Sequence, residues 1–253
     1  MLENLKENGV NVKLIFVVII FIFLLLLFII FGIKSGGYMI INENLILTKK
    51  GKEWSQIKKI NDSLFKKEYS VYSSKGKTDG VTINYSNNNF YYYDNMYKDL
   101  NLNKVSVAYT KEFKNIKVAD YDVSFYDNSD DLYMQEVLKD RDISNFKNSV
   151  IKSSFDLDSD GISENIYTMT NMSLAGENEK NYSSIFLVKN DKVIDVLDDD
   201  SSQPYLVQNI IDLDGDGKYE VVVSKGTIDN PTFSTCGQIY KISGSKIKRI
   251  KDC

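Results

Sequence analysis

The sequence of 253 residues contains no histidine, two cysteines and two prolines. Without histidine the chain has neither a Ser-His-Asp or Cys-His nucleophilic system nor a histidine-ligated zinc site, and two cysteines are too few for a structural zinc site. No phosphate-cradling glycine loop or dinucleotide fingerprint occurs. The net charge of −4 argues against nucleic-acid binding. Carboxylates, of which the chain has 35, are the side chains left for specific chemistry.

Acidic residues gather in two short segments of the same spacing, DLDSDGISE at 156–164 and DLDGDGKYE at 212–220. Each places acids at positions 1, 3, 5 and 9, which brings several hard oxygen ligands around one point. Glycine at position 6, Gly161 or Gly217, permits a tight turn that a Cβ would strain. Calcium takes roughly 6 to 8 oxygen ligands, and three carboxylates, one carbonyl and a bidentate glutamate supply about six. Each segment is therefore predicted to bind one calcium ion.

The predicted ligands are four acidic side chains and one backbone carbonyl in each loop. In chain order they are Asp156, Asp158, Asp160, the Ile162 carbonyl and Glu164 in the first loop, and Asp212, Asp214, Asp216, the Lys218 carbonyl and Glu220 in the second. Two calcium ions would bring the formal charge from −4 to 0. The acidic clusters are thus expected to be ion cages rather than a polyanionic surface.

The position of the last acid distinguishes these loops from EF-hands. An EF-hand has its bidentate glutamate at position 12, where this chain has Tyr167 or Val223 in strand-like runs. An acid at position 9 that leads directly into a strand resembles the FG-GAP repeat of integrin-alpha-type propellers and the similar VCBS-like repeats of bacterial surface proteins. The resemblance covers residues 151–253, and the first loop departs from it with Ser159 where the family prefers glycine or asparagine. It implies propeller-blade-like repeats, structural calcium and a role in interaction or adhesion.

The two copies also agree outside the loops. The loops are offset by 56 residues, and SIFLVKNDKVIDV at 184–196 aligns with QIYKISGSKIKRI at 238–250 at an offset of 54. Each of these segments has the strand, polar turn and strand of a hairpin. Repetition at this period indicates stacked or radially arranged blades. Because the chain is too short for seven blades of about 50 to 60 residues, we expect a small or open variant, or completion by partners.

A long hydrophobic run lies near the N-terminus. Leu14 to Ile33 are 20 consecutive apolar residues or glycine, and a helix of that length spans the roughly 30 Å hydrocarbon layer of a membrane. A cleavable signal peptide has a shorter apolar core and a small-residue cleavage site. The sequence therefore predicts a single transmembrane helix over 14–33, preceded by a cytoplasmic tail over 1–13.

Charge does not orient this helix, because lysines flank it on both sides. We place the C-terminal domain outside the cytoplasm because extracellular calcium loops work at roughly 10⁻⁴ to 10⁻³ M calcium. Cys236 and Cys253 bracket the final hairpin. They would form a disulfide or remain two unrelated thiols, and the sequence does not decide between the two.

Residues 34–70 are predicted to form a membrane-proximal linker and a helix. Apolar residues recur at spacings of three and four from Glu53 to Glu68, which is typical of an amphipathic helix. We expect this helix to pack on the domain, with a position on the membrane surface as the alternative. The residues that carry the pattern are Trp54, Ile57, Ile60, Leu64 and Phe65.

Residues 71–150 alternate between apolar and polar side chains, broken by Gly, Asn and Asp, and are predicted to form short antiparallel strands. Ser129 or Asp130 would cap a short helix through Lys139. Three further acids lack the calcium spacing and are expected to be solvated turn residues: Asp120, Asp122 and Asp127. A tyrosine cluster is expected to pack in a sheet: Tyr91, Tyr92, Tyr93 and Tyr97.

We therefore expect a mainly β protein of antiparallel propeller-blade-like repeats, anchored by its N-terminal helix and bound to a protein or glycan partner. One alternative is a subunit of a larger cell-envelope or secretion assembly. Another is a glycan hydrolase with an acid and a nucleophile among the aspartates after the second hairpin strand. The candidate residues are Asp195, Asp198, Asp199 and Asp200, and the favoured interpretation is that 198–204, DDDSSQP, forms an exposed turn between the repeats.

Overall fold

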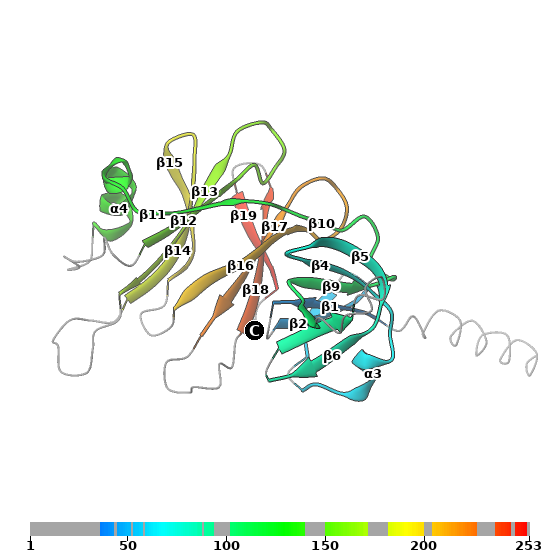
Figure 1. Cartoon of the computed structure of the whole chain (residues 1–253). Helices are drawn as coiled ribbons and strands as arrows, with labels where there is room; N and C mark the ends of the chain where they lie inside the picture. The colour runs from blue at the N-terminus through cyan, green and yellow to red at the C-terminus, as the bar shows by residue number, and fades with distance from the viewer. Residues whose placement is uncertain are drawn as a thin grey trace, which may run out of the picture. The chain divides into compact units, whose positions relative to one another are not determined.

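The computed structural model shows a mainly β protein with antiparallel sheets, none of which is closed (Figure 1). This confirms the predicted fold class at that level. The predicted tail and transmembrane helix, 1–33, lie outside the described residues, and within these no helix is long and apolar enough to cross a membrane. The described residues are 36–42, 45–51, 53–57, 59–87, 89–93, 102–139, 150–171, 182–199, 204–226, 236–243 and 246–251.

The N-terminal part of the described chain forms a six-stranded sheet and a three-stranded sheet. The larger sheet has the strand order β3-β2-β1-β9-β4-β5 and the smaller one the order β6-β7-β8. Their bounds are β1 Gly37–Ile41, β2 Leu45–Lys50, β3 Glu53–Gln56, β4 Tyr69–Ser73, β5 Gly76–Val81, β6 Ile83–Ser86, β7 Asn89–Tyr93, β8 Leu102–Lys104 and β9 Val107–Thr110. The short antiparallel strands predicted after Tyr69 are therefore present. Tyr92 is buried in this region and its hydroxyl lies 2.9 Å from Ser73 Oγ.

The C-terminal part forms two five-stranded sheets of the same construction. Their strand orders are β11-β12-β13-β14-β15 and β10-β16-β17-β18-β19. Each has four strands that follow one another along the chain, with one earlier strand added at the edge. The bounds are β10 Lys117–Val118, β11 Asp122–Phe125, β12 Val150–Phe155, β13 Glu164–Asn171, β14 Tyr182–Lys189, β15 Lys192–Asp199, β16 Tyr205–Asp212, β17 Glu220–Lys225, β18 Cys236–Ser243 and β19 Lys246–Lys251.

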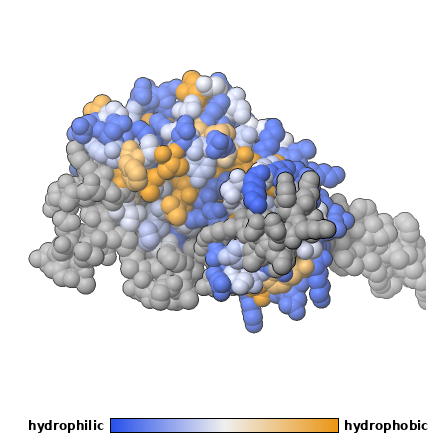
Figure 2. Space-filling model, viewed as in Figure 1, coloured by the Kyte–Doolittle hydropathy of each residue, from blue (hydrophilic) through white to orange (hydrophobic). Residues whose placement is uncertain are grey.

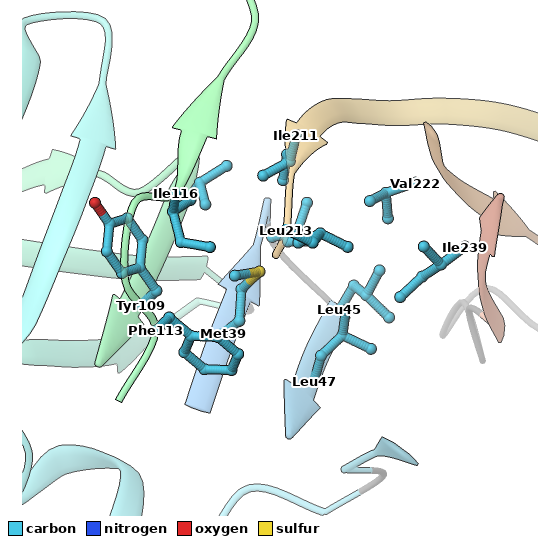
Figure 3. Close-up of a cluster of buried hydrophobic side chains, with 12 residues drawn as sticks. Met39, Leu45, Leu47, Tyr109, Phe113, Ile116, Ile211, Leu213, Val222 and Ile239 are labelled. Atoms are coloured by element: carbon cyan, nitrogen blue, oxygen red, sulfur yellow. The ribbon is translucent and has the colours of Figure 1, made fainter. Parts of the chain in front are cut away.

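A buried cluster joins the six-stranded sheet to the sheet of β16–β19. Figure 3 shows side chains of β1 and β2, among them Met39 and Leu45, beside Val222 and Ile239 of β17 and β18. A Cβ added to Gly237 would lie 2.3 Å from Leu45 Cδ1, so the leucine occupies the space that a side chain at this position would need. Residues far apart in the sequence thus share one core.

The helix predicted from Glu53 to Glu68 is wrong. Glu53–Gln56 is strand β3, paired with β2, and only α3, Asp62–Phe65, is helical, with Asn61 as its cap. The apolar residues contact two different clusters. Trp54 stacks on Phe113 at 5.5 Å between ring centroids in the cluster of Figure 3, whereas the other four pack on a second cluster around β4 and β7. Their helical spacing therefore does not arise from one helix, since among the described residues of 53–68 only α3 is helical.

A second short helix lies where the sequence predicts one, and Asp130, one of the two predicted caps, stands at its N-cap position without a side-chain capping hydrogen bond. The 3-10 helix η1, Asn128–Asp130, leads into α4, Asp131–Leu138. Asp127, expected to be a solvated turn acid, is the residue whose carboxylate accepts the Ser129 amide hydrogen at 2.7 Å. Asp130 is buried, and accepts hydrogen bonds from Tyr167 Oη at 2.6 Å and from Lys152 Nζ at 3.3 Å.

Replacing Leu45 with alanine is expected to lower the free energy of unfolding by about 2 to 5 kcal/mol, because it opens a cavity in the core shared by the two sheets. Chemical unfolding of the full chain in mild detergent measures the change. Leu132, 74% exposed on α4, supplies the matched control, and Leu132→Ala should alter stability by less than about 0.5 kcal/mol. Equal effects of the two substitutions would contradict the shared core.

Candidate metal centres

Each acidic loop connects the first and second of four consecutive antiparallel strands. The first loop runs from the end of β12 to Glu164, which opens β13, and the second runs from the end of β16 to Glu220, which opens β17. The leucine at position 2, Leu157 or Leu213, is 0% or 2% exposed and packs into a core cluster. Packing of this leucine therefore fixes each loop to the sheet beneath it.

The aspartate at position 1 shapes the loop backbone. Asp156 accepts hydrogen bonds from the amides of Asp160 and Gly161 at 3.0 and 2.9 Å. Asp212 accepts them from Gly215 and Gly217 at 2.7 and 3.1 Å. Both carboxylate oxygens of each residue are thus used to fold the loop.

Positions 4 and 6 of both loops have a left-handed backbone. The φ angles are 61° and 89° at Ser159 and Gly161, and 76° and 85° at Gly215 and Gly217. A side chain with a Cβ is disfavoured in this region, which explains glycine at three of the four positions. Ser159 is the exception, and it adopts the same backbone conformation as the glycine of the second loop.

The glutamate at position 9 closes each loop from below. Glu164 Oε2 accepts the Leu157 amide hydrogen at 2.7 Å, and Glu220 Oε2 accepts that of Leu213 at 2.8 Å. Both glutamates are almost fully buried, with 0% and 1% exposure. Their other oxygens, Oε1, are directed into the loop, where each faces a lysine ammonium group.

The loops bring together two acidic triads that could hold a metal ion. Within each triad, one carboxylate oxygen from each residue lies within 4.8 Å of the others. All donors are carboxylate oxygens, the ligands that suit calcium and magnesium rather than zinc. The aspartates at position 5 lie outside the triads. The backbone carbonyls of Ile162 and Lys218 are ligands by prediction alone. The triads are Asp156, Asp158 and Glu164, and Asp212, Asp214 and Glu220.

A lysine from the third strand enters each loop, which the sequence did not predict. Lys189 Nζ lies 2.8 Å from Asp158 Oδ2, 2.8 Å from Asp160 Oδ2 and 2.5 Å from Glu164 Oε1. Burial alone would lower the pKa of Lys189, but its hydrogen bonds to these carboxylates outweigh this and raise the pKa. The ammonium group therefore stays charged at neutral pH.

The second loop contains the same arrangement. Lys241 Nζ lies 2.8 Å from Asp214 Oδ2, from Asp216 Oδ2 and from Glu220 Oε1. As in the first loop, hydrogen bonds to the carboxylates outweigh burial and raise the pKa of Lys241. Lysine thus contacts positions 3, 5 and 9 in both copies.

The register of the sheets, not the sequence alignment, makes the two lysines equivalent. Glu220 pairs with Lys241 across β17 and β18, and Asn165 pairs with Val188, which puts Lys189 beside Glu164. The hairpin alignment at an offset of 54 instead matches Lys189 with Ser243. Sequence reasoning could have identified these lysines only through their pairing with the loop glutamates, and predicting that pairing requires the strand register.

The two loops also contact each other. The Tyr219 amide donates to the Leu157 carbonyl at 2.7 Å, and Ser159 Oγ donates to the Gly217 carbonyl at 2.6 Å. The rings of Phe155 and Tyr219 meet edge to face at 4.7 Å between centroids. Repeat spacing alone did not predict this contact.

The remaining candidate residues lie apart from these loops. Asp195 and Asp198 belong to strand β15, so the predicted turn begins later than expected, and Asp200 lies outside the described residues. The turn prediction is wrong for 198–199 because β15 continues to pair with β14 through Asp199. Cys236 opens β18, and Cys253 is outside the described residues.

No family model, curated protein or solved structure matches the chain.

Asp212→Ala is expected to lower the free energy of unfolding by about 1 to 3 kcal/mol, because the amides of Gly215 and Gly217 lose their acceptor. Chemical unfolding of the full chain in mild detergent tests this. The control is Asp120→Ala, which removes an exposed aspartate and should change stability by less than about 0.5 kcal/mol. If Asp212→Ala is as harmless as the control, the hydrogen bonds at position 1 do not hold the loop.

Proposed function

We propose that the protein is a membrane-anchored, extracytoplasmic, calcium-binding β domain that acts as an interaction or adhesion module. One observation carries the proposal: the same acidic loop, with the same backbone conformation, recurs between the first two strands of two similar sheets. A loop that served only as a turn would not need a buried glutamate and three aspartates in both copies.

Calcium is the ion that the donors favour. The predicted ligands of each loop are all oxygens. Four carboxylates converge at positions 1, 3, 5 and 9, and the buried one, at position 9, needs a positive charge or donor beside it. A bound ion would cancel the repulsion between them and hold the entry to β13 and β17, Glu164–Asn171 and Glu220–Lys225. Its binding free energy would thereby add to folding free energy.

The blade-like architecture supports the resemblance to FG-GAP and VCBS-like repeats. Propeller blades are four-stranded antiparallel sheets, and both β12–β15 and β16–β19 have four such strands in chain order. We interpret these two sheets as blade-like repeats of an open arrangement. Repeats of this kind present loops for binding, which favours a protein or glycan partner over a substrate.

The proposed location follows from the sequence. The apolar run at 14–33 would anchor the chain, and calcium sites of this type are filled at the roughly 10⁻⁴ to 10⁻³ M calcium found outside cells.

Calorimetric titration of the full chain in mild detergent with calcium is expected to show two bound ions with dissociation constants of roughly 10⁻⁴ to 10⁻³ M. Glu220→Gln should leave one, because it removes the charge of the buried ligand of the second loop. The matched control is Glu53→Gln, at an exposed residue of β3, which should leave both. Absence of calcium binding in the unchanged protein would refute the proposed function.

A second candidate, a subunit of a larger envelope assembly, is favoured by exposed apolar side chains. Val123 and Phe125 on edge strand β11 are 62% and 76% exposed, and both lie on one face of the strand because side chains alternate. Figure 2 shows hydrophobic patches within a largely hydrophilic face of the molecule. An unpaired strand edge with apolar side chains is a usual site of protein association.

Cross-linking and co-purification from membranes test this candidate. A defined partner should be recovered with the unchanged chain and lost with Phe125→Ser, while Leu132→Ser on α4, which is also exposed, should retain it. Recovery of the same partner with both variants would show that β11 is not the contact.

A further inference from the structure

The two lysine ammonium groups contact carboxylates that a calcium ion would need as ligands. Each Nζ lies 2.5 to 2.8 Å from one oxygen of each of positions 3, 5 and 9, and these positions supply three of the predicted ion ligands. Calcium binds oxygen ligands at about 2.3 to 2.6 Å. An ion held by the same three oxygens would overlap the ammonium group, so the two cations exclude each other.

The ammonium group satisfies the buried carboxylates on its own. A lysine has three hydrogen-bond donors and no acceptor, and each of these lysines faces three carboxylates. Glu164 and Glu220 are 0% and 1% exposed, and a carboxylate so deeply buried is stable only beside a positive charge or a donor. Lysine supplies that charge in both loops.

The arrangement is built twice from different sequence positions. Lys189 is the last residue before the turn of its hairpin, whereas Lys241 is two residues further from its turn. A shift of two residues keeps a side chain on the same face of a strand, while a shift of one would reverse it. Both lysines therefore reach their loop, although the two strands are placed differently against their turns.

We propose that Lys189 and Lys241 are built-in cations that close the two acidic loops without a metal ion, so that calcium binds only by displacing them. The inference rests on the proposed function for its calcium step and goes beyond it in assigning a role to the lysines. Displacement would release each lysine side chain from its loop and so couple calcium to the third strand, β14 or β18.

The test compares the full chain with Lys189→Met and Lys241→Met, each in mild detergent. Methionine keeps much of the length of the side chain and removes its charge. Each variant should bind calcium at its own loop at least tenfold more tightly than the unchanged chain in calorimetric titration. In chelator, where the loop has lost the ammonium group that faces its carboxylates, each should melt about 5 to 10 °C lower, and calcium should restore the loss.

The control is Lys75→Met, which neutralises an exposed lysine in the turn between β4 and β5. It should match the unchanged chain in both measurements. If a methionine variant folds in neither condition, Lys189→Gln and Lys241→Gln replace the pair, with the same expected shifts.

The outcomes separate this inference from the proposed function. The role of the lysines is overturned if the variants have the same calcium affinity as the unchanged chain and the same melting temperature in chelator. Two ions bound by the unchanged chain would still support the proposed function. If neither the unchanged chain nor the variants bind calcium, the proposed function fails. In that case displacement is overturned too, and lower melting of the variants would support the lysines as internal cations only.

Discussion

The structure of the C-terminal sheets depends on how a buried glutamate carboxylate is neutralised. Glu164 and Glu220 each open the second strand of a sheet and tie it through one oxygen to the amide of the leucine at position 2. That leucine is itself part of the core. The glutamate therefore links strand, loop and hydrophobic interior, but only if its second oxygen faces a positive charge. Whatever cation occupies the loop also decides how firmly the strand is held.

The neighbouring loops extend this constraint across both sheets. Hydrogen bonds from Tyr219 to Leu157 and from Ser159 to Gly217 join residues of one loop to the backbone of the other. A change of cation in one loop would thus alter the hydrogen bonds that hold the backbone of the second. The core under Leu213 also includes Met39 and Leu45 of the first sheet, so the effect would reach the N-terminal part of the domain.

The loops could be predicted from the sequence because they are local. Spacing of acids and glycines over nine residues determines the backbone hydrogen bonds and the left-handed turns, and the structure contains both. The lysines could not be predicted, since Lys189 and Glu164 meet only through the register of β13 and β14. The helix expected from Glu53 was wrong for a related reason: apolar residues at helical spacing belong to two clusters that only the packed sheets define.

If the proposal holds, the division of tasks within each loop would let one fold accept either cation. At position 1, both carboxylate oxygens of Asp156 or Asp212 accept hydrogen bonds from backbone amides, so the turn is stabilised without a cation. Positions 3, 5 and 9 leave oxygens for the cation, and an ammonium group with three donors matches them one for one. Lysine offers a single positive charge on a flexible stem, whereas a divalent ion offers two and takes more ligands. Under the proposal, the same turn would hold a lysine at low calcium and an ion at high calcium, with the oxygens of positions 3, 5 and 9 changing partner.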